Sequence, residues 1–151
     1  MRAIHAFAAV SALALALVCG AVLAQAKTTP AYRVVVNPAN AATVADRRFL
    51  QEAFLKKVTR WSDSDVVIRP VDLPPGSPVR RAFSDDVLNR SVDAVKGYWQ
   101  QRIFSGRDVP PPEFDTDDDV IKYVLNHEGA VGYVSANVHL DRDGPRVVAV
   151  R

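Results

Sequence analysis

The chain has 151 residues, in which 19 lysines and arginines nearly balance 17 aspartates and glutamates. There is no basic excess and no long run of like charge, which argues against nucleic acid as a partner. The length suits one compact domain that builds its own hydrophobic core.

The N-terminal residues have the layout of a secretory signal peptide. Arg2 gives a short basic start, residues 6–24 are almost continuously apolar, and small residues in an Ala-x-Ala pattern follow at 24–26. We expect a cleaved leader over residues 1–26, a periplasmic protein and no stable membrane span after cleavage; an uncleaved anchor is the alternative. Because the single cysteine, Cys19, lies in the leader, residues 27–151 would form one domain without disulfides or thiolate metal sites.

Three elements are predicted in the first half of this domain. The β-branched run over residues 32–36, stopped by Asn37 and Pro38, predicts a buried strand. Residues 46–57 place their apolar side chains on one helical face and their charges on the other. The apolar run over residues 66–71 predicts a second strand.

A glycine turn then leads into a helix over residues 77–88. Ser77 is a good N-cap and Pro78 suits the first helical position, where a missing N–H costs nothing. Such a helix start presents free backbone amides and a positive dipole end, so it can bind an anion. A plain strand-to-helix connection is the alternative, and arginines in the first turn, Arg80 and Arg81, are commonly solvated.

The second half continues the alternation of helices and strands. Ser91 caps a further amphipathic helix, and prolines 110–112 force an extended surface connection. Thr116 opens a helix with three aspartates in its first turn, and residues 130–134 form a short internal strand whose Gly132 allows close approach of the backbone. With a final strand over residues 147–150, the pattern predicts an α/β fold with a central mixed sheet flanked by helices.

Other candidate sites have simpler explanations. The aspartates at 117–119 point about 100° apart around the helix, so we assign them to the helix dipole and not to a metal. His127 and His139 lack metal-ligand spacing and are assigned to capping or the surface. Ser77 lacks the glycines of a nucleophile elbow, so no catalysis and no cofactor are expected. Trp61 and Trp99 are assigned to the core.

Several segments, in this order, resemble one family. The resemblance is to periplasmic phosphate-binding proteins, the substrate-binding subunits of phosphate ABC importers, whose motifs are N-P-x-N, F-x-G-K-x-x-x-W, G-S-G-T with a following phenylalanine, and G-A-I-G-Y-V. The corresponding segments here are residues 37–40, 54–61, 76–83 and 129–134. Lys56 stands where the second motif has glycine. The matched segments belong mostly to the second lobe of the family's two-lobe proteins.

The resemblance implies a type II periplasmic-binding-protein fold, of which this chain is long enough for about one lobe. At the start of the helix we expect a weak site for an anion or another small molecule, formed by Gly76, Ser77, the Val79 backbone N–H and Arg80. Pro78 and Val79 replace the glycine and threonine of the family pattern, and Leu73 replaces its phosphate-contacting arginine. These replacements remove an N–H donor, a hydroxyl and a cation.

We therefore expect an exported solute-binding-like protein that resembles the phosphate-binding subunit of an ABC importer, with weak or altered binding of a small anion such as phosphate. The alternative is a ligand-free periplasmic interaction or accessory module with an envelope protein or a second copy as its partner. The retained glycine–serine turn favours the first hypothesis, and the lost arginine and threonine favour the second.

Overall fold

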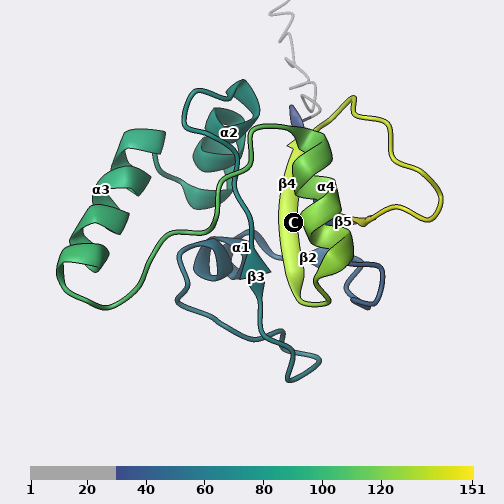
Figure 1. Ribbon diagram of the computed structural model, residues 1–151, viewed down its shortest axis with the longest axis horizontal. Helices are drawn as coiled ribbons and strands as arrows, with labels where there is room; N and C mark the ends of the chain where they lie inside the picture. Colours follow the sequence, from purple (N-terminus) through teal and green to yellow (C-terminus); the bar gives the residue numbers. More distant parts are fainter. Residues whose placement is uncertain (1–29) are drawn as a thin grey trace, which may run out of the picture.

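The computed structural model describes residues 30–151, which form a five-stranded mixed sheet with helices on its faces (Figure 1). The leader predicted over residues 1–26 lies outside the described residues. The strands, in spatial order, are β2 (Val44–Ala45), β5 (Arg146–Val150), β1 (Tyr32–Val36), β4 (Ala130–Ser135) and β3 (Arg69–Pro70). Strand β1 is antiparallel to both neighbours, and each edge strand is parallel to the strand beside it. The predicted fold class is confirmed.

The helices begin where the sequence predicts. Polar N-caps accept hydrogen bonds from the first turns of the four α-helices within residues 30–151, and the three caps predicted at Ser77, Ser91 and Thr116 are confirmed. The helices are α1 (Arg47–Phe54), α2 (Pro78–Phe83), which continues as the π-helix η1 (Ser84–Leu88), α3 (Val92–Phe104) and α4 (Asp117–Asn126).

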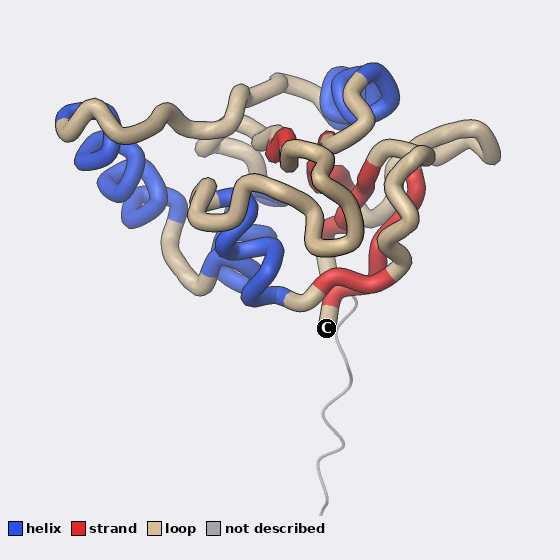
Figure 2. The backbone as a smooth tube through the Cα atoms, turned by 90° about the horizontal axis from the view of Figure 1, so that it is seen from below, coloured by secondary structure: helices blue, strands red, loops and turns tan. Residues whose placement is uncertain are grey.

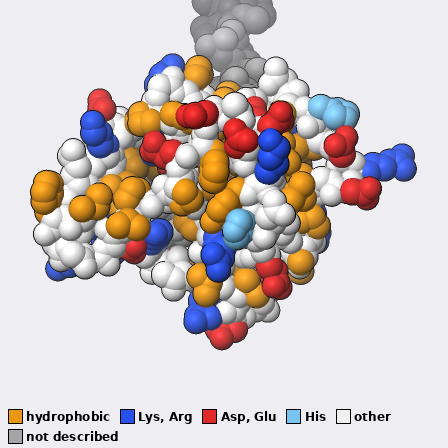
Figure 3. All heavy atoms as spheres, in the orientation of Figure 1, with side chains coloured by type: hydrophobic (Ala, Val, Ile, Leu, Met, Phe, Trp, Pro, Cys, Tyr) orange, Lys and Arg blue, Asp and Glu red, His pale blue; other side chains and the backbone are white. Residues whose placement is uncertain are grey.

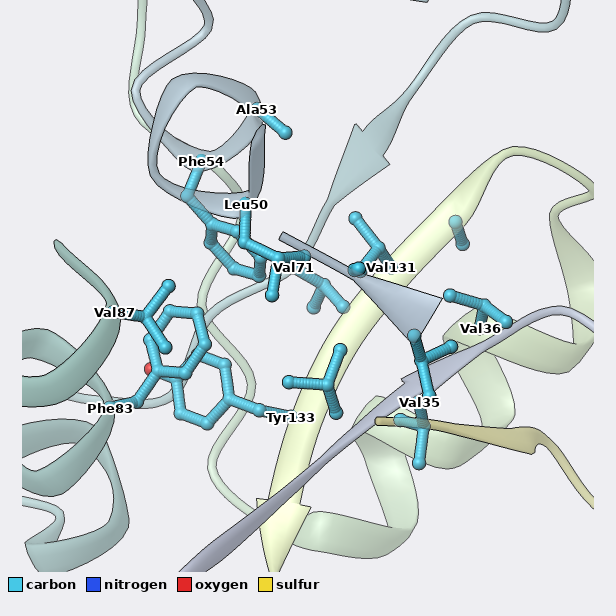
Figure 4. Close-up of a cluster of buried hydrophobic side chains, with 14 of the residues drawn as sticks. Val35, Val36, Leu50, Ala53, Phe54, Val71, Phe83, Val87, Val131 and Tyr133 are labelled. Carbon is cyan, nitrogen blue, oxygen red and sulfur yellow. The ribbon is translucent and has the colours of Figure 1, made fainter. Parts of the chain in front are cut away.

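Helices cover both faces of the sheet, and two consecutive residues of β4 show how. Side chains alternate between the faces of a strand, so Gly132 and Tyr133 point in opposite directions. A Cβ atom at Gly132 would lie 2.8 Å from the side chain of Val120 on α4, which confirms the predicted close approach. On the other face, Tyr133 stacks on Phe83 with ring centroids 3.9 Å apart (Figure 4).

The predicted strand over residues 66–71 is shorter in the structure. Strand β3 covers only Arg69–Pro70, and Val71 also donates its N–H to Val131 of β4, whereas the preceding residues turn to a different partner. Ile68 donates its N–H to Thr59, and Val66 accepts one from Trp61, so this part of the chain pairs with the segment that follows α1. Strand β2 was not predicted, since two residues carry too little pattern.

Helix α3 lies at the far end of the molecule from most of the strands, as Figures 1 and 2 both show. It packs against the rest of the protein through its two buried residues, Val95 and Trp99, and through Tyr98, whose hydroxyl donates to the Leu55 carbonyl at 2.9 Å. Its last turn stays in solvent, with Ile103 49% and Phe104 90% exposed. No helix within residues 30–151 combines the length and apolar character needed to cross a membrane.

Candidate functional site

The candidate site is the turn between β3 and α2. The N–H of Ser77 donates to the carbonyl of Pro74 at 2.9 Å, which closes the turn and leaves Gly76 exposed. The Ser77 hydroxyl accepts the N–H of Arg80 at 3.3 Å, as an N-cap does. The turn thus has the strand, glycine and capped-helix geometry that the sequence predicts.

The four predicted site residues differ in burial. Gly76 is exposed, Ser77 and Val79 are half-buried, and Arg80 is only 4% exposed. Arg81 is the solvated arginine of the first turn, and its guanidinium donates to the Gly76 carbonyl at 3.3 Å. The alternative that both arginines lie in solvent is therefore wrong for Arg80.

Arg80 lies beneath the turn in a buried polar cluster. One terminal nitrogen, Nη1, forms an ion pair with Asp72 and donates to the Leu73 carbonyl at 2.8 Å. Glu113, more exposed, has a carboxylate oxygen 3.8 Å from the same nitrogen. Burial of this guanidinium is tolerable because a carboxylate accompanies it.

The Nε atom of Arg80, unlike Nη1, is not paired within residues 30–151. It is buried and has no hydrogen-bond partner among the described residues. A buried charged donor without an acceptor costs free energy, so this atom is the unsatisfied donor of the cluster.

Several interactions shift the pKa of Asp72 in opposite directions. Burial raises the pKa of its carboxyl group to about 6, while the charge of Arg80, the Tyr133 hydroxyl and the Leu73 N–H lower it. The Tyr133 hydroxyl donates to Asp72, and burial together with that carboxylate raises the pKa of Tyr133 far above its ordinary value. Tyr133 therefore stays neutral and acts as a donor.

Sequence reasoning missed Asp72 and Glu113 as members of this cluster. The proline segment 110–112, expected as a surface connection, instead lies beside the end of β3. Asp72 donates its N–H to Pro112, and Phe114 donates to the Asp72 carbonyl, each at 2.9 Å. For Asp72, the sequence feature that could have predicted this role is its position directly after an apolar strand. The sequence around Glu113 contains no comparable feature.

Position 73 has an apolar side chain, and the cation of this cluster comes from Arg80 instead. Leu73 is buried, and its side chain lies in the hydrophobic core. The position where the resembled family has arginine thus contributes apolar packing and a backbone carbonyl. The cation at this point of the fold comes from Arg80, one turn into α2.

The remaining candidates take the simpler roles assigned to them. Thr116 caps α4 and bonds Asp119, while the ring of His127 lies 2.8 Å from the Tyr123 carbonyl at the end of the same helix. Trp61 and Trp99 are buried, as predicted. Within residues 30–151, no group of three or more histidine, cysteine or acidic side chains has an arrangement that could hold a metal ion.

The sheet order, the faces covered by helices and the strand-to-helix turn define one lobe of a periplasmic-binding-protein fold. No protein-family model matches the sequence, and a search of curated proteins finds no match. Solved structures do match, and they share this fold.

Two of these structures are proteins named for phosphate transport, and a third is named PstS. A protein described as a phosphate ABC transporter substrate-binding protein from Clostridium perfringens, with bound phosphate, has a TM-score of 0.60 and 21% identity over 82% of this chain and 47% of its own. An ABC-type phosphate transport receptor from Vibrio cholerae has a TM-score of 0.59 and 19% identity, covering 82% of this chain and 48% of its own. PstS from Borrelia burgdorferi has a TM-score of 0.60 and 13% identity, covering 80% and 47%.

The chain thus spans about half the length of the structures that it matches. The resemblance to phosphate-binding proteins predicted from the sequence is confirmed at the level of the fold, as a match to a single lobe.

Proposed function

We propose that this chain is an exported solute-binding-like protein that takes a small anion such as phosphate at Gly76, Ser77, the Val79 N–H and Arg80. The observation that carries the proposal is the buried guanidinium of Arg80 beneath a capped strand-to-helix turn. It is supported by the single-lobe similarity to proteins named for phosphate transport.

Binding should be weak or altered. Pro78 offers no N–H and Val79 no hydroxyl, so few donors converge on an anion at the turn. The Asp72 carboxylate already pairs with Arg80 and would repel a second anion. A dissociation constant in the millimolar range, about −4 kcal/mol of binding free energy, fits so few contacts.

Isothermal titration with phosphate and sulfate tests the proposal, with two serine variants as a matched pair. Ser77→Ala and Ser91→Ala each remove an N-cap hydroxyl, which accepts an amide at 3.3 and 3.2 Å respectively, and each should cost about 1 kcal/mol of stability. Only Ser77→Ala should weaken anion binding. No heat and no thermal shift at high anion concentration, or equal weakening in both variants, would overturn the anion site.

Export is the other part of the proposal. Expression of the full chain in a Gram-negative host should yield a periplasmic protein whose mass corresponds to a start near Lys27. Recovery of the uncleaved chain in the membrane fraction would support the anchored alternative.

A further inference from the structure

A cavity of about 270 Å³ lies between α3 and the Asp72–Pro75 segment, and Arg80 lines it. Gly76, Ser77 and Val79 do not belong to its lining, so it is distinct from the surface of the turn. Its volume suits a small molecule. The rest of its lining comes from the segment after β3, from α3 and from the connection to α4.

Arg80, which lines this cavity, has a side-chain donor without an acceptor among residues 30–151. Arg80 is 4% exposed, its Nη1 atom is engaged with Asp72 and Leu73, and its Nε atom is buried without a partner among residues 30–151. A guanidinium edge of this kind matches the two oxygens of a carboxylate in geometry and charge.

The charges around the cavity favour a monoanion. Asp72 offsets Arg80, and Glu113 offsets Lys96, so the formal charges of the lining sum to zero. A dianion such as hydrogen phosphate would meet two carboxylates without surplus positive charge. A single carboxylate needs less compensation.

The walls favour an apolar ligand body. Val92, Trp99 and Ile103 of α3 face the cavity, and Pro75 and Pro110 line it as well. Figure 3 shows hydrophobic side chains gathered at the α3 end of the molecule. Ile103 is 49% exposed, so a ligand with an apolar body would remove exposed hydrocarbon from water, whereas phosphate would not.

We propose that this cavity binds a small organic monocarboxylate with an aliphatic or aromatic body, its carboxylate at the guanidinium of Arg80 and its body against α3. This inference rests on the proposed solute-binding function and names the ligand class at Arg80.

Titration of the domain with benzoate, hexanoate, benzyl alcohol and inorganic phosphate, followed by calorimetry and amide NMR shifts, tests the inference. Benzoate or hexanoate should bind and shift residues of α3 and the Asp72–Pro75 segment. Benzyl alcohol, which keeps the ring but lacks the charge, should bind at least about tenfold more weakly, a difference of about 1.4 kcal/mol. Equal binding of the alcohol would overturn the role of Arg80.

Two neighbouring variants of α3 give a matched control. Ile103→Asp places a negative charge in the cavity wall, while Phe104→Asp makes a similar change on a side chain that does not line it. Both residues are exposed, so both variants should fold, which circular dichroism checks. Carboxylate affinity should fall about tenfold or more in Ile103→Asp and stay unchanged in Phe104→Asp.

The outcomes separate this inference from the proposed anion site. Phosphate binding that is sensitive to Ser77→Ala, with no carboxylate binding, would overturn the inference and leave the anion site in place. Carboxylate binding that is sensitive to Ile103→Asp and insensitive to Ser77→Ala would support the inference. No binding of any probe would overturn both.

Discussion

Leucine at position 73 leaves the end of β3 without a side-chain cation, and Arg80 reaches the same point from the following helix. The sequence predicts that Arg80 lies in the first turn of a helix but does not predict its burial. Burial depends on Asp72 and Glu113, and the latter is 33 positions away from Arg80 in the chain. Local patterns of hydrophobicity and capping carry no information about a pairing over that distance.

The buried carboxyl of Asp72 predicts an unusual dependence of stability on pH. Its folded-state pKa of about 6 lies above the ordinary value of 3.8, so the folded protein binds the proton more tightly than the unfolded chain. The stabilisation from this group is complete below pH 3.8 and is lost as the pH rises through about 6. A shift of about two units corresponds to up to about 3 kcal/mol.

Urea unfolding of the wild-type protein and of Asp72→Asn, at several pH values between about 4 and 7, measures this contribution. The wild-type protein should gain free energy of unfolding relative to the variant as the pH falls. Acidic groups whose pKa is lowered, such as Asp86 and Asp108, titrate in both proteins and cancel in the comparison. A difference independent of pH, or one that shrinks toward acid, would show that the Arg80 ion pair keeps Asp72 ionised.

At the scale of elements, the sequence predicts those features that depend on local interactions, such as the first residue of a helix. Ser77, Ser91 and Thr116 fix the starts of three helices because each hydroxyl satisfies an amide of its own first turn. The strand predicted over residues 66–71 is too long because the apolar character of this run indicates burial but not a pairing partner. Which segment it pairs with is decided by the chain after α1 and by β4.

The packing of α4 on the sheet predicts that Gly132 tolerates no side chain. In Gly132→Ala the new Cβ would lie 2.8 Å from methyl groups of both Val120 and Val71, so the helix or the strand must shift. We expect a loss of about 1–3 kcal/mol, the usual cost of overpacking. Gly97→Ala on α3 is the control, because nothing lies within 4 Å of its Cβ and alanine should gain about 0.5–1 kcal/mol there. Chemical denaturation of both variants checks the pair; equal effects would contradict the packing described for α4.

At the scale of the whole molecule, residues 30–151 match about half the length of the solved structures and contain one hydrophobic core of their own. The core contains residues of β1, β4 and β5 together with all the helices, and it extends through Phe83 and Leu88 to Val95 and Trp99 on α3. The sequence allows this to be anticipated from length and composition alone. It does not reveal that α3 buries only Val95 and Trp99, because its apolar stripe continues to Ile103, which the structure leaves exposed.

The protein starting at Lys27 should therefore unfold as one cooperative unit in which α3 takes part. The two tryptophans report on opposite parts of the molecule: Trp61 donates to the Gly129 carbonyl beside β4, and Trp99 packs α3 against the core. In Trp99→Phe the fluorescence comes from Trp61 alone, so its urea transition should coincide with that of the far-ultraviolet circular dichroism. The same agreement is expected in Trp61→Phe, where Trp99 is the reporter.

A Trp99 transition at distinctly lower urea than the loss of the sheet would mean that α3 opens separately. The cavity between α3 and Arg80 would then be a property of only part of the folded population, and ligand affinity would fall by the fraction of molecules in which α3 is detached.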